Sequence, residues 1–369
     1  MMQAEDRGSP FLAFSDLLTG YRGSAVLMLA HESGLFDLLA SQGGFAEEIC
    51  AAIGWDLEYG RRFLDCLCQL GFLGKEENRY GLSPEAKPYL ERHSPHSLRR
   101  TLDFEQQLRL SWSQLDATLK TGGRIFAAGD KSPEELHQAR IRYLGAMDEA
   151  AGVRAAEVWQ CCPGLPPSGI MLDLGAGSGA FIAEFLRRNP EWSAIFCDLP
   201  EIIASEELHR RLTPWRERVT WCGCNLLDKE SSDLDRIPDR DCDLVLLSNV
   251  LHCQGTEESL LILRKAVSKT SAQGLLIVHD FFADTDWRGA LYDLHMMLNT
   301  YNGKTHRQDD IIDAASRCGL GSHRTRQLPS GSTLLAFARA EEPLRRFDPA
   351  TTPANMGAEP LAIHPDSRG

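Results

Sequence analysis

Hydrophobic and polar positions follow two different patterns along the chain, and the change between them falls near residue 160. From Phe11 to about Leu119 the apolar residues recur at helical spacing, as in Ala25, Met28 and Leu29. Beyond Gly169, short continuous apolar runs alternate with amphipathic stretches. Continuous apolar runs separated by helices are typical of a parallel sheet that is covered on both faces. The pattern therefore predicts a helical part followed by a doubly wound α/β part.

The runs after Gly169 can be assigned to individual strands and helices. We expect strands at IMLDL, SAIFCDL, CDLVLLSNVL and GLLIVHDFF, and helices at GAFIAEFLRRN, EESLLILRKAVSKT and DDIIDAASRCG. HRTRQLPSGSTLLAFARA has two β segments around a Pro-Ser-Gly turn, which predicts an antiparallel hairpin added to the sheet. The segment LHMMLNTYNGKTHRQ has little periodicity and several polar groups.

The helical part contains a short β hairpin. GRRFLDCLCQLGFL predicts a helix that ends at Gly71, and Phe72 to Leu82 predicts a hairpin with a charged turn. Helices followed by such a hairpin resemble a winged helix, which can bind DNA or serve for packing and dimerisation. Few other cations accompany Arg61 and Arg62 on the preceding helix, so the second function is favoured.

Two breaks divide the chain. CCPGLPPSG, residues 161–169, cannot continue a helix, and after Ala340 the composition turns to Pro, Ala, Thr and charged residues. Two further helices are expected over Thr101–Lys120 and Pro133–Gln160, before the first break. We therefore expect a helical domain over 1–160, an α/β domain over 161–340 and a loose tail over 341–369.

Charge and composition exclude several classes of partner. The chain has 369 residues and a net charge of -13, a poor match for a nucleic-acid backbone. Its N-terminus, MMQAEDRGSP, lacks the pattern of a signal peptide, and no segment is apolar over the length of a membrane span. We expect a cytoplasmic protein that binds neither nucleic acid nor membrane.

Cysteine spacing argues against a disulfide framework and a structural zinc site. The chain has 11 cysteines, an odd number, and no secretory signal, so reduced thiols are expected. The close pairs Cys66/Cys68, Cys161/Cys162 and Cys222/Cys224 include no CxxC spacing.

A glycine-rich turn predicts a nucleoside site. In LDLGAGSGAF, Asp173 ends a strand and Gly175, Gly177 and Gly179 form the turn; Asp198 ends the next strand. These glycines let backbone amides approach a ligand, and an acid at that position can accept hydrogen bonds from ribose hydroxyls. The turn satisfies both the dinucleotide fingerprint and the D-x-G-x-G-x-G turn of S-adenosylmethionine sites. A plain turn, with Asp198 as the cap of a helix, is the structural alternative.

Other polar residues follow later strands and would meet at the same sheet edge. Asn225 can offer an amide to a purine. His252 follows CDLVLLSNVL, where an imidazole could take a proton from a hydroxyl, and Asp280 could orient it. His279, beside a buried strand, is interpreted as structural.

Together these motifs resemble the small-molecule S-adenosylmethionine-dependent O-methyltransferases of the caffeate and acetylserotonin type, with their bacterial relatives. LDLGAGSGAF, FCDLPEII, SNVLHCQGTEES, GLLIVHDFF and the final hairpin follow in the family's order. The resemblance implies a Rossmann-like class I methyltransferase sheet behind a winged-helix-like dimerisation domain, hence a homodimer acting in secondary metabolism. It favours S-adenosylmethionine, with S-adenosylhomocysteine as product, over a nicotinamide cofactor.

The resemblance also implies roles for individual residues. His252 falls on the catalytic base, Asp280 on its supporting acid, and His306 where plant members carry a second glutamate. The implied cofactor residues are Asp173, Gly175, Gly177, Gly179, Asp198, Leu199, Asn225, Leu226 and Ser248. The implied acceptor residues are Trp112, His295, Met296 and Asn299, which suit a flat, largely apolar molecule with a hydroxyl.

Departures from the family keep two alternatives open. The family's tryptophan after the histidine is replaced by Cys253 and Gln254, and Asn225 stands where an aspartate is common. His252 and His295, with His306 nearby, could instead hold a metal for C-methylation of an enolisable substrate. The chain could also be a non-catalytic ligand-binding regulator with the same fold.

Overall fold

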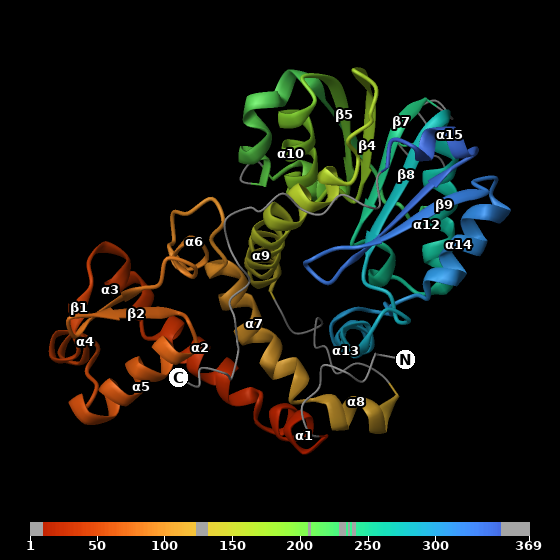
Figure 1. Cartoon of the computed structure of the whole chain (residues 1–369). Helices are drawn as coiled ribbons and strands as arrows, with labels where there is room; N and C mark the ends of the chain where they lie inside the picture. Colours follow the sequence, from red (N-terminus) through yellow and green to blue (C-terminus); the bar gives the residue numbers. More distant parts are fainter. Residues whose placement is uncertain are drawn as a thin grey trace. The chain divides into compact units, whose positions relative to one another are not determined.

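The computed structural model describes residues 10–122, 132–205, 208–228, 234, 237 and 241–347 (Figure 1). The described residues form two compact units, and the division between them falls between Gln106 and Gln107. Helix α7 (Arg99–Trp112) runs across this division. Each unit is described separately below.

The first unit is a group of helices with a small antiparallel sheet in the order β1-β3-β2. Glu77 and Asn78 both have positive φ values, 49° and 66°, as a tight two-residue hairpin turn between β2 and β3 requires. The hairpin expected from the sequence is therefore confirmed. The elements are α1 (Pro10–Thr19), α2 (Tyr21–Glu32), α3 (Leu35–Ser41), β1 (Gly44–Phe45), α4 (Ala46–Ile53), α5 (Leu57–Gln69), β2 (Leu73–Glu76), β3 (Arg79–Leu82) and α6 (Lys87–Leu90).

The second unit is built on a seven-stranded sheet in the order β6-β5-β4-β7-β8-β10-β9. Neighbouring strands from β6 to β8 are parallel, whereas β10 is antiparallel to both β8 and β9. This arrangement confirms the doubly wound sheet with a terminal hairpin. The strands are β4 (Ser168–Leu174), β5 (Glu191–Asp198), β6 (Val219–Gly223), β7 (Cys242–Ser248), β8 (Thr270–Asp280), β9 (Ser322–Gln327) and β10 (Thr333–Ala338).

Both faces of this sheet are buried. Along β7, Leu244 and Leu246 join one hydrophobic core, and Val245 and Leu247 join the other. Helices α9 and α10 cover the first face, and α12 and α14 cover the second (Figure 1). The helices of this unit after α7 are α8 (Leu115–Thr121), α9 (Pro133–Gln160), α10 (Ala180–Arg188), α11 (Pro200–Ile203), α12 (Thr256–Lys269), α13 (Trp287–Asn299), α14 (Gln308–Arg317) and α15 (Glu341–Leu344), with 3-10 helices η1 (Leu208–Arg218) and η3 (Leu251–Cys253).

Helix α9 packs on the sheet domain, although the sequence suggested a boundary after residue 160. The indole nitrogen of Trp159 donates to the carbonyl of Phe181, 2.9 Å away, and its ring packs edge-on against Phe185. The division before Gln107 therefore differs from the expected one because this helix buries its apolar end against α10. Residues 341–347 also belong to the fold, since Leu344 and Phe347 are buried; residues 348–369 lie outside the described residues.

One helical assignment was wrong. The helix expected over Thr101–Lys120 is interrupted after α7, where the hydroxyl of Ser113 donates to the carbonyl of Leu110 and competes with the backbone. The segment LHMMLNTYNGKTHRQ, whose periodicity is weak, contains the C-terminal part of α13.

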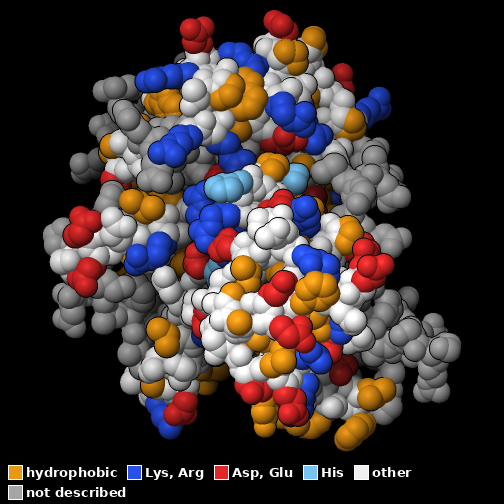
Figure 2. Space-filling view, turned by 90° about the vertical axis from the view of Figure 1, so that its left-hand side faces the viewer, with side chains coloured by type: hydrophobic (Ala, Val, Ile, Leu, Met, Phe, Trp, Pro, Cys, Tyr) orange, Lys and Arg blue, Asp and Glu red, His pale blue; other side chains and the backbone are white. Residues whose placement is uncertain are grey.

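The surface in Figure 2 carries acidic, basic and hydrophobic side chains in mixture. Among the described residues, no helix combines the length and the apolar character needed to cross a bilayer.

Candidate functional site

The glycine turn after β4 requires glycine at each of its three positions. Gly175, Gly177 and Gly179 have φ values of 81°, 58° and 74°, in the left-handed region. A Cβ on Gly175 would lie 2.6 Å from the side chain of Val250, and one on Gly179 would lie 2.6 Å from Leu212. A Cβ on Gly177 would meet nothing within 4 Å. The turn is thus packed on two sides and open at its middle glycine.

Two carboxylates flank this turn. Asp198 accepts a hydrogen bond from the amide of Gly177 at 2.7 Å and another from the amide of Leu199 at 2.7 Å. Asp173 is buried, and neither of its carboxylate oxygens has a hydrogen-bond partner in the described structure. Burial, with a smaller contribution from Asp198, raises the pKa of Asp173 to about 8. This part of the site therefore holds two acidic groups that influence each other.

The segment after β6 lies beside Asp198. The amide of Cys224 donates to the carbonyl of Asp198 at 2.8 Å, which brings Asn225 to the same sheet edge. The side-chain oxygen of Asn225 accepts from the amide of Leu227, so its amide group is left for other partners. Leu226 is buried in the core, whereas Leu199 is 37% exposed.

Three thiols meet behind this edge, which the sequence did not predict. Cys197, Cys222 and Cys224 are buried, and their sulfur atoms lie within 4.8 Å of one another. In the described part of the chain they are the only group of three or more residues able to share a metal ion; neither His252 nor His295 belongs to such a group. Hydrogen bonds with the neighbouring thiols, together with burial, raise the pKa of Cys197 far above its ordinary value, so this thiol stays protonated.

His252 and Asp280 form a buried pair at the carboxyl ends of β7 and β8. Nδ1 of His252 is hydrogen-bonded to Oδ1 of Asp280, and the His252 amide donates to Oδ2 at 3.3 Å. The amide of Phe281 also donates to Oδ1, at 2.7 Å. Burial disfavours the protonated imidazole, but Asp280 outweighs it, so the pKa of His252 lies well above 6.5. The carboxylate thus holds the ring with Nε2 facing away from it.

Tyr292 of α13 lies against that Nε2. Its hydroxyl oxygen is 3.4 Å from Nε2 of His252, and the two rings meet edge-on with centroids 5.0 Å apart. The Tyr292 ring also packs on Phe281, with centroids 4.3 Å apart, and on His295 at 5.5 Å. Burial raises the pKa of Tyr292, so its phenol is neutral.

The row of rings extends in both directions from Tyr292. Trp112 stacks on His295 with centroids 6.4 Å apart, and the guanidinium of Arg154 lies 5.2 Å from the ring centroid of Phe281. On α13, the amide of Asn299 donates to the carbonyl of His295, and Met296 is buried. Aromatic surface therefore borders the base on the α13 side.

His279 has the structural position expected for it. Its Nδ1 lies 2.8 Å from the hydroxyl of Ser248, and its Nε2 lies 2.8 Å from the hydroxyl of Ser332. Burial, with Arg154 nearby, lowers the pKa of His279 to about 3. The neutral ring links β7 and β8 to the turn before β10. It also binds the hydroxyl of Ser248, which the resemblance assigned to the cofactor site.

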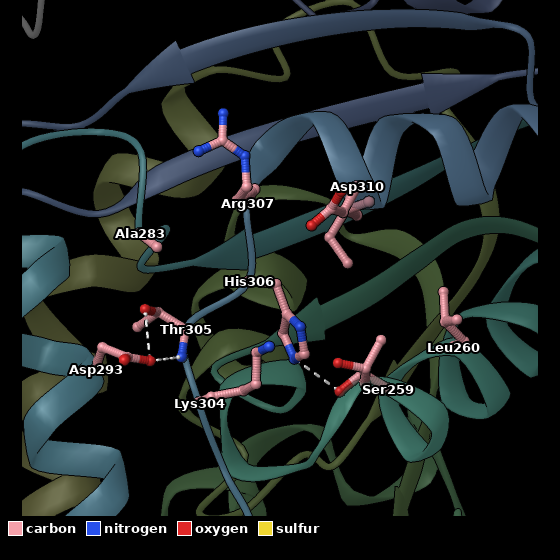
Figure 3. A pocket seen from close by; sticks show the side chains of 11 residues that line it. Ser259, Leu260, Ala283, Asp293, Lys304, Thr305, His306, Arg307 and Asp310 are labelled. Carbon is pink, nitrogen blue, oxygen red and sulfur yellow. Dashed lines mark hydrogen bonds between the residues drawn. The ribbon is translucent and has the colours of Figure 1, made fainter.

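His306 contacts the backbone just before His252. Its Nε2 donates to the carbonyl of Leu251 at 3.1 Å and lies 2.9 Å from the hydroxyl of Ser259, toward which the ring points in Figure 3. The ring lines a cavity of about 420 Å³ whose wall also includes Lys304 and Asp310. Among the described residues, the two imidazoles do not contact each other. His306 instead reaches the loop of His252 through the carbonyl of Leu251.

Two family models match the chain. The model of the O-methyltransferase domain matches residues 112–320, which is more than half of the 369 residues. The chain belongs to the O-methyltransferase family. The model of the O-methyltransferase dimerisation domain matches residues 15–92. The methyl donor of this O-methyltransferase is S-adenosylmethionine, the cofactor of the family.

Curated relatives and solved structures agree with this assignment. The O-methyltransferase is 28% identical to the tetracenomycin polyketide synthesis 8-O-methyl transferase TcmO of Streptomyces glaucescens, over 88% of this chain and 95% of the relative. It is 26% identical to a 3-amino-4-hydroxybenzoate 4-O-methyltransferase of Streptomyces cremeus, over 87% and 88%. The human N-acetylserotonin methyltransferase structure aligns with a TM-score of 0.73 at 19% identity, over 92% and 100%, which confirms the fold.

In this O-methyltransferase, the residues predicted from the sequence form two groups. Asp173, the three glycines, Asp198 and Asn225 lie at one end of the sheet edge, and the pair of His252 and Asp280 lies beside them. Val250, two residues before the histidine, lies against Gly175 and connects the groups. Tyr292 and Arg154 were missed, because no motif marks them and their contacts depend on how α13 and α9 pack.

Proposed function

We propose that this O-methyltransferase methylates a phenolic hydroxyl of a small aromatic or polyketide-like molecule, with His252 as general base. The observation that carries the proposal is the buried His252 and Asp280 pair, next to the glycine turn and bordered by aromatic rings. The names of three relatives support the acceptor class: TcmO of tetracenomycin synthesis, the hydroxybenzoate enzyme, and a 3-hydroxy-5-methyl-1-naphthoate 3-O-methyltransferase of Streptomyces sahachiroi.

The residues at the sheet edge fit S-adenosylmethionine. Asp173 is a buried acid without a partner among the described residues, and its pKa is about 8. A cationic ligand would favour its ionised form, and S-adenosylmethionine carries a sulfonium and an ammonium group. A dinucleotide would instead bring a negative pyrophosphate toward Asp173 and Asp198. In this proposal Asp173 and the open amide edge at Gly177 hold the methionine part, Asp198 holds the ribose, and Asn225 lies near the adenine.

Bound S-adenosylmethionine supplies a methyl carbon that is electrophilic because it is attached to a sulfonium. Nε2 of His252 takes the proton of the acceptor hydroxyl, while Asp280 holds Nδ1–H and stabilises the imidazolium that forms. The amides of His252 and Phe281 keep the carboxylate in place. General base catalysis of this kind contributes about 10² to 10⁴ in rate, and the alignment of acceptor and donor contributes the rest.

Metal-assisted C-methylation has less support. It needs His252 and His295 to share an ion, but the ring of Tyr292 contacts both imidazoles, and the described residues supply no third ligand beside them. The non-catalytic alternative does not account for a base held by its acid, and the family is one of enzymes.

We further propose a homodimer formed through the first unit, in which residues 15–92 match the dimerisation domain. Light scattering of the full chain at micromolar concentration should give twice the 41.0 kDa of one chain. A monomeric mass would refute this part of the proposal.

The proposed reaction is tested with S-adenosylmethionine carrying a labelled methyl group and a panel of phenols that includes hydroxybenzoates and hydroxynaphthoates. We expect an oxygen-linked methyl group by NMR, S-adenosylhomocysteine in equal amount, and loss of about 10²-fold or more in kcat for His252→Ala. Calorimetry of S-adenosylhomocysteine should give unchanged affinity in that variant. Near-normal turnover by His252→Ala, or a methyl group on carbon, would contradict the proposal.

A further inference from the structure

Arg154 is a cation without a direct polar partner. Among the interactions of the described residues, its guanidinium makes no hydrogen bond and no ion pair; its close contact is the ring of Phe281. Other buried or half-buried arginines of the chain are matched: Arg211 pairs with Asp148 at 2.7 Å, and Arg218 donates to backbone carbonyls. The lack of a partner at Arg154 is therefore unusual in this structure.

The surroundings of Arg154 explain why a partner is needed. Burial lowers the pKa of Arg154, which means that its charge is partly removed from water without compensation. The nearest acid to influence it is Glu157, one turn later on α9, but a Glu157 oxygen accepts from the amide of Ser330 at 3.2 Å. A desolvated, unmatched guanidinium beside a catalytic centre indicates an anionic group of a ligand.

Arg154 is also positioned relative to the base. The guanidinium lies over Phe281, Phe281 packs on Tyr292, and Tyr292 meets Nε2 of His252. A flat acceptor lying along these rings would present its hydroxyl to His252 and its opposite end to Arg154. Cation–π contact with Phe281 leaves the planar edge of the guanidinium free for the two oxygens of a carboxylate.

We propose that Arg154 binds a carboxylate of the acceptor, so that the preferred substrates are hydroxylated aromatic acids with the acid group remote from the reacting hydroxyl. This inference rests on the proposed function, because it names the acceptor class of the same site. Arg154 is thus a specificity-determining residue that takes no part in proton transfer. The alternative is that Arg154 only packs on Phe281.

The test compares matched acceptors rather than one substrate. A panel of hydroxynaphthoic acids with different spacings between hydroxyl and carboxylate is paired with the corresponding carboxamides and naphthols. Each compound is titrated by calorimetry into the full-length enzyme saturated with S-adenosylhomocysteine, and methyl transfer is measured separately. We expect at least one acid to bind about 10- to 100-fold more tightly than its amide, the range for a paired charged hydrogen bond.

Variants assign this preference to the guanidinium. Arg154→Met should remove the difference between acid and amide and raise KM for the acid, with little change in kcat. Arg154→Lys should keep part of the preference, because it keeps the charge but loses the planar fork. Arg142→Met, at an exposed position of the same helix, is the matched control and should change nothing. S-adenosylhomocysteine affinity and the unfolding midpoint show whether each variant is folded.

Binding and turnover separate the two proposals. If the wild type binds an acid more tightly than its amide and Arg154→Met does not, the Arg154 assignment is supported. This holds even when no compound is methylated; in that case only the proposed reaction fails. The Arg154 assignment is overturned if the wild type binds acid and amide equally, or if the acid preference survives in Arg154→Met. Failure of every acid to bind also overturns it.

Discussion

The hydroxyl oxygen of Tyr292 lies 3.4 Å from Nε2 of His252, on the side of the imidazole that faces away from Asp280. In the proposed reaction, an acceptor hydroxyl must reach this same nitrogen to give up its proton. The phenol of Tyr292 therefore holds the place that the acceptor has to take, and the two compete for it.

This competition predicts opposite outcomes for two substitutions. Tyr292→Phe keeps the ring contact with Phe281 and removes the competing hydroxyl, so kcat/KM should stay within about tenfold of the wild type. Tyr292→Ala removes the ring and should raise KM for an aromatic acceptor by about tenfold or more. Steady-state kinetics at saturating S-adenosylmethionine measure both. If the two variants were equally impaired, the hydroxyl itself would take part in proton transfer.

The raised pKa of His252 predicts the pH dependence of the reaction. The base acts in its neutral form, so kcat/KM should rise with pH through an apparent pKa above 6.5. Asp280→Asn removes the charge that raises this pKa, so the rise should move to lower pH while the maximal rate falls. A pH profile of both enzymes with one acceptor tests this. An unmoved acidic limb would mean that another group controls it.

Asp198 should contribute to cofactor affinity in an acid-sensitive way. Asp198→Asn should weaken S-adenosylhomocysteine binding by about tenfold or more, because a charged acceptor of hydrogen bonds is lost. Burial raises the pKa of Asp198 above 3.8, so wild-type affinity should begin to fall at a higher pH than that of an exposed aspartate. Calorimetry between pH 4 and 8 measures this, with Glu191→Gln, at the exposed start of β5, as control. Equal losses in both variants would remove Asp198 from the site.

The glycine turn allows fold and ligand binding to be separated. Gly175→Ala places a Cβ against Val250 in a left-handed conformation and should destabilise the protein by about 2 kcal/mol or more. Gly177→Ala meets open space, so it should cost about 1 kcal/mol and act mainly by weakening cofactor binding. Urea unfolding with and without S-adenosylhomocysteine measures the two effects. A larger loss of stability in Gly177→Ala would contradict this description.

His279 should make the fold sensitive to acid. Its pKa in the folded state, about 3, lies below its ordinary 6.5, so below that value the unfolded chain takes up a proton and the folded chain does not. The contribution of His279 to the free energy of unfolding is therefore complete above pH 6.5 and decreases as the pH falls toward 3. His279→Asn should cost about 1 to 3 kcal/mol at pH 7, by leaving Ser248 and Ser332 unpaired, and should flatten the acid dependence. Urea unfolding at several pH values tests both.

The fold was largely predictable because buried parallel strands leave a simple mark in the sequence. The run LVLL, residues 244–247, is apolar throughout, since Leu244 and Val245 face different cores. Helix α13 left no such mark. Its site-facing positions include Tyr292, His295 and Asn299, and polar aromatic and amide groups there blur the helical periodicity.

The site could be predicted only where topology brings residues together. Asp280 ends β8, and His252 lies in η3, shortly after the neighbouring parallel strand β7, so their approach follows from the strand order. The positions of Tyr292 and Arg154 follow from side-chain packing between helices and sheet, which spacing in the sequence does not encode. The meeting of Cys197 with Cys222 follows from the register of β5 and β6.

Tyr292, His295, Met296 and Asn299 follow one another at helical spacing along a single face of α13, whereas the residues proposed for donor and base follow the strands. In the proposed site, changes in acceptor preference can therefore accumulate by point mutation on one helix, away from the strand ends proposed for methyl donation. A family built in this way can diversify its products quickly. For laboratory evolution, the same four positions define a compact library.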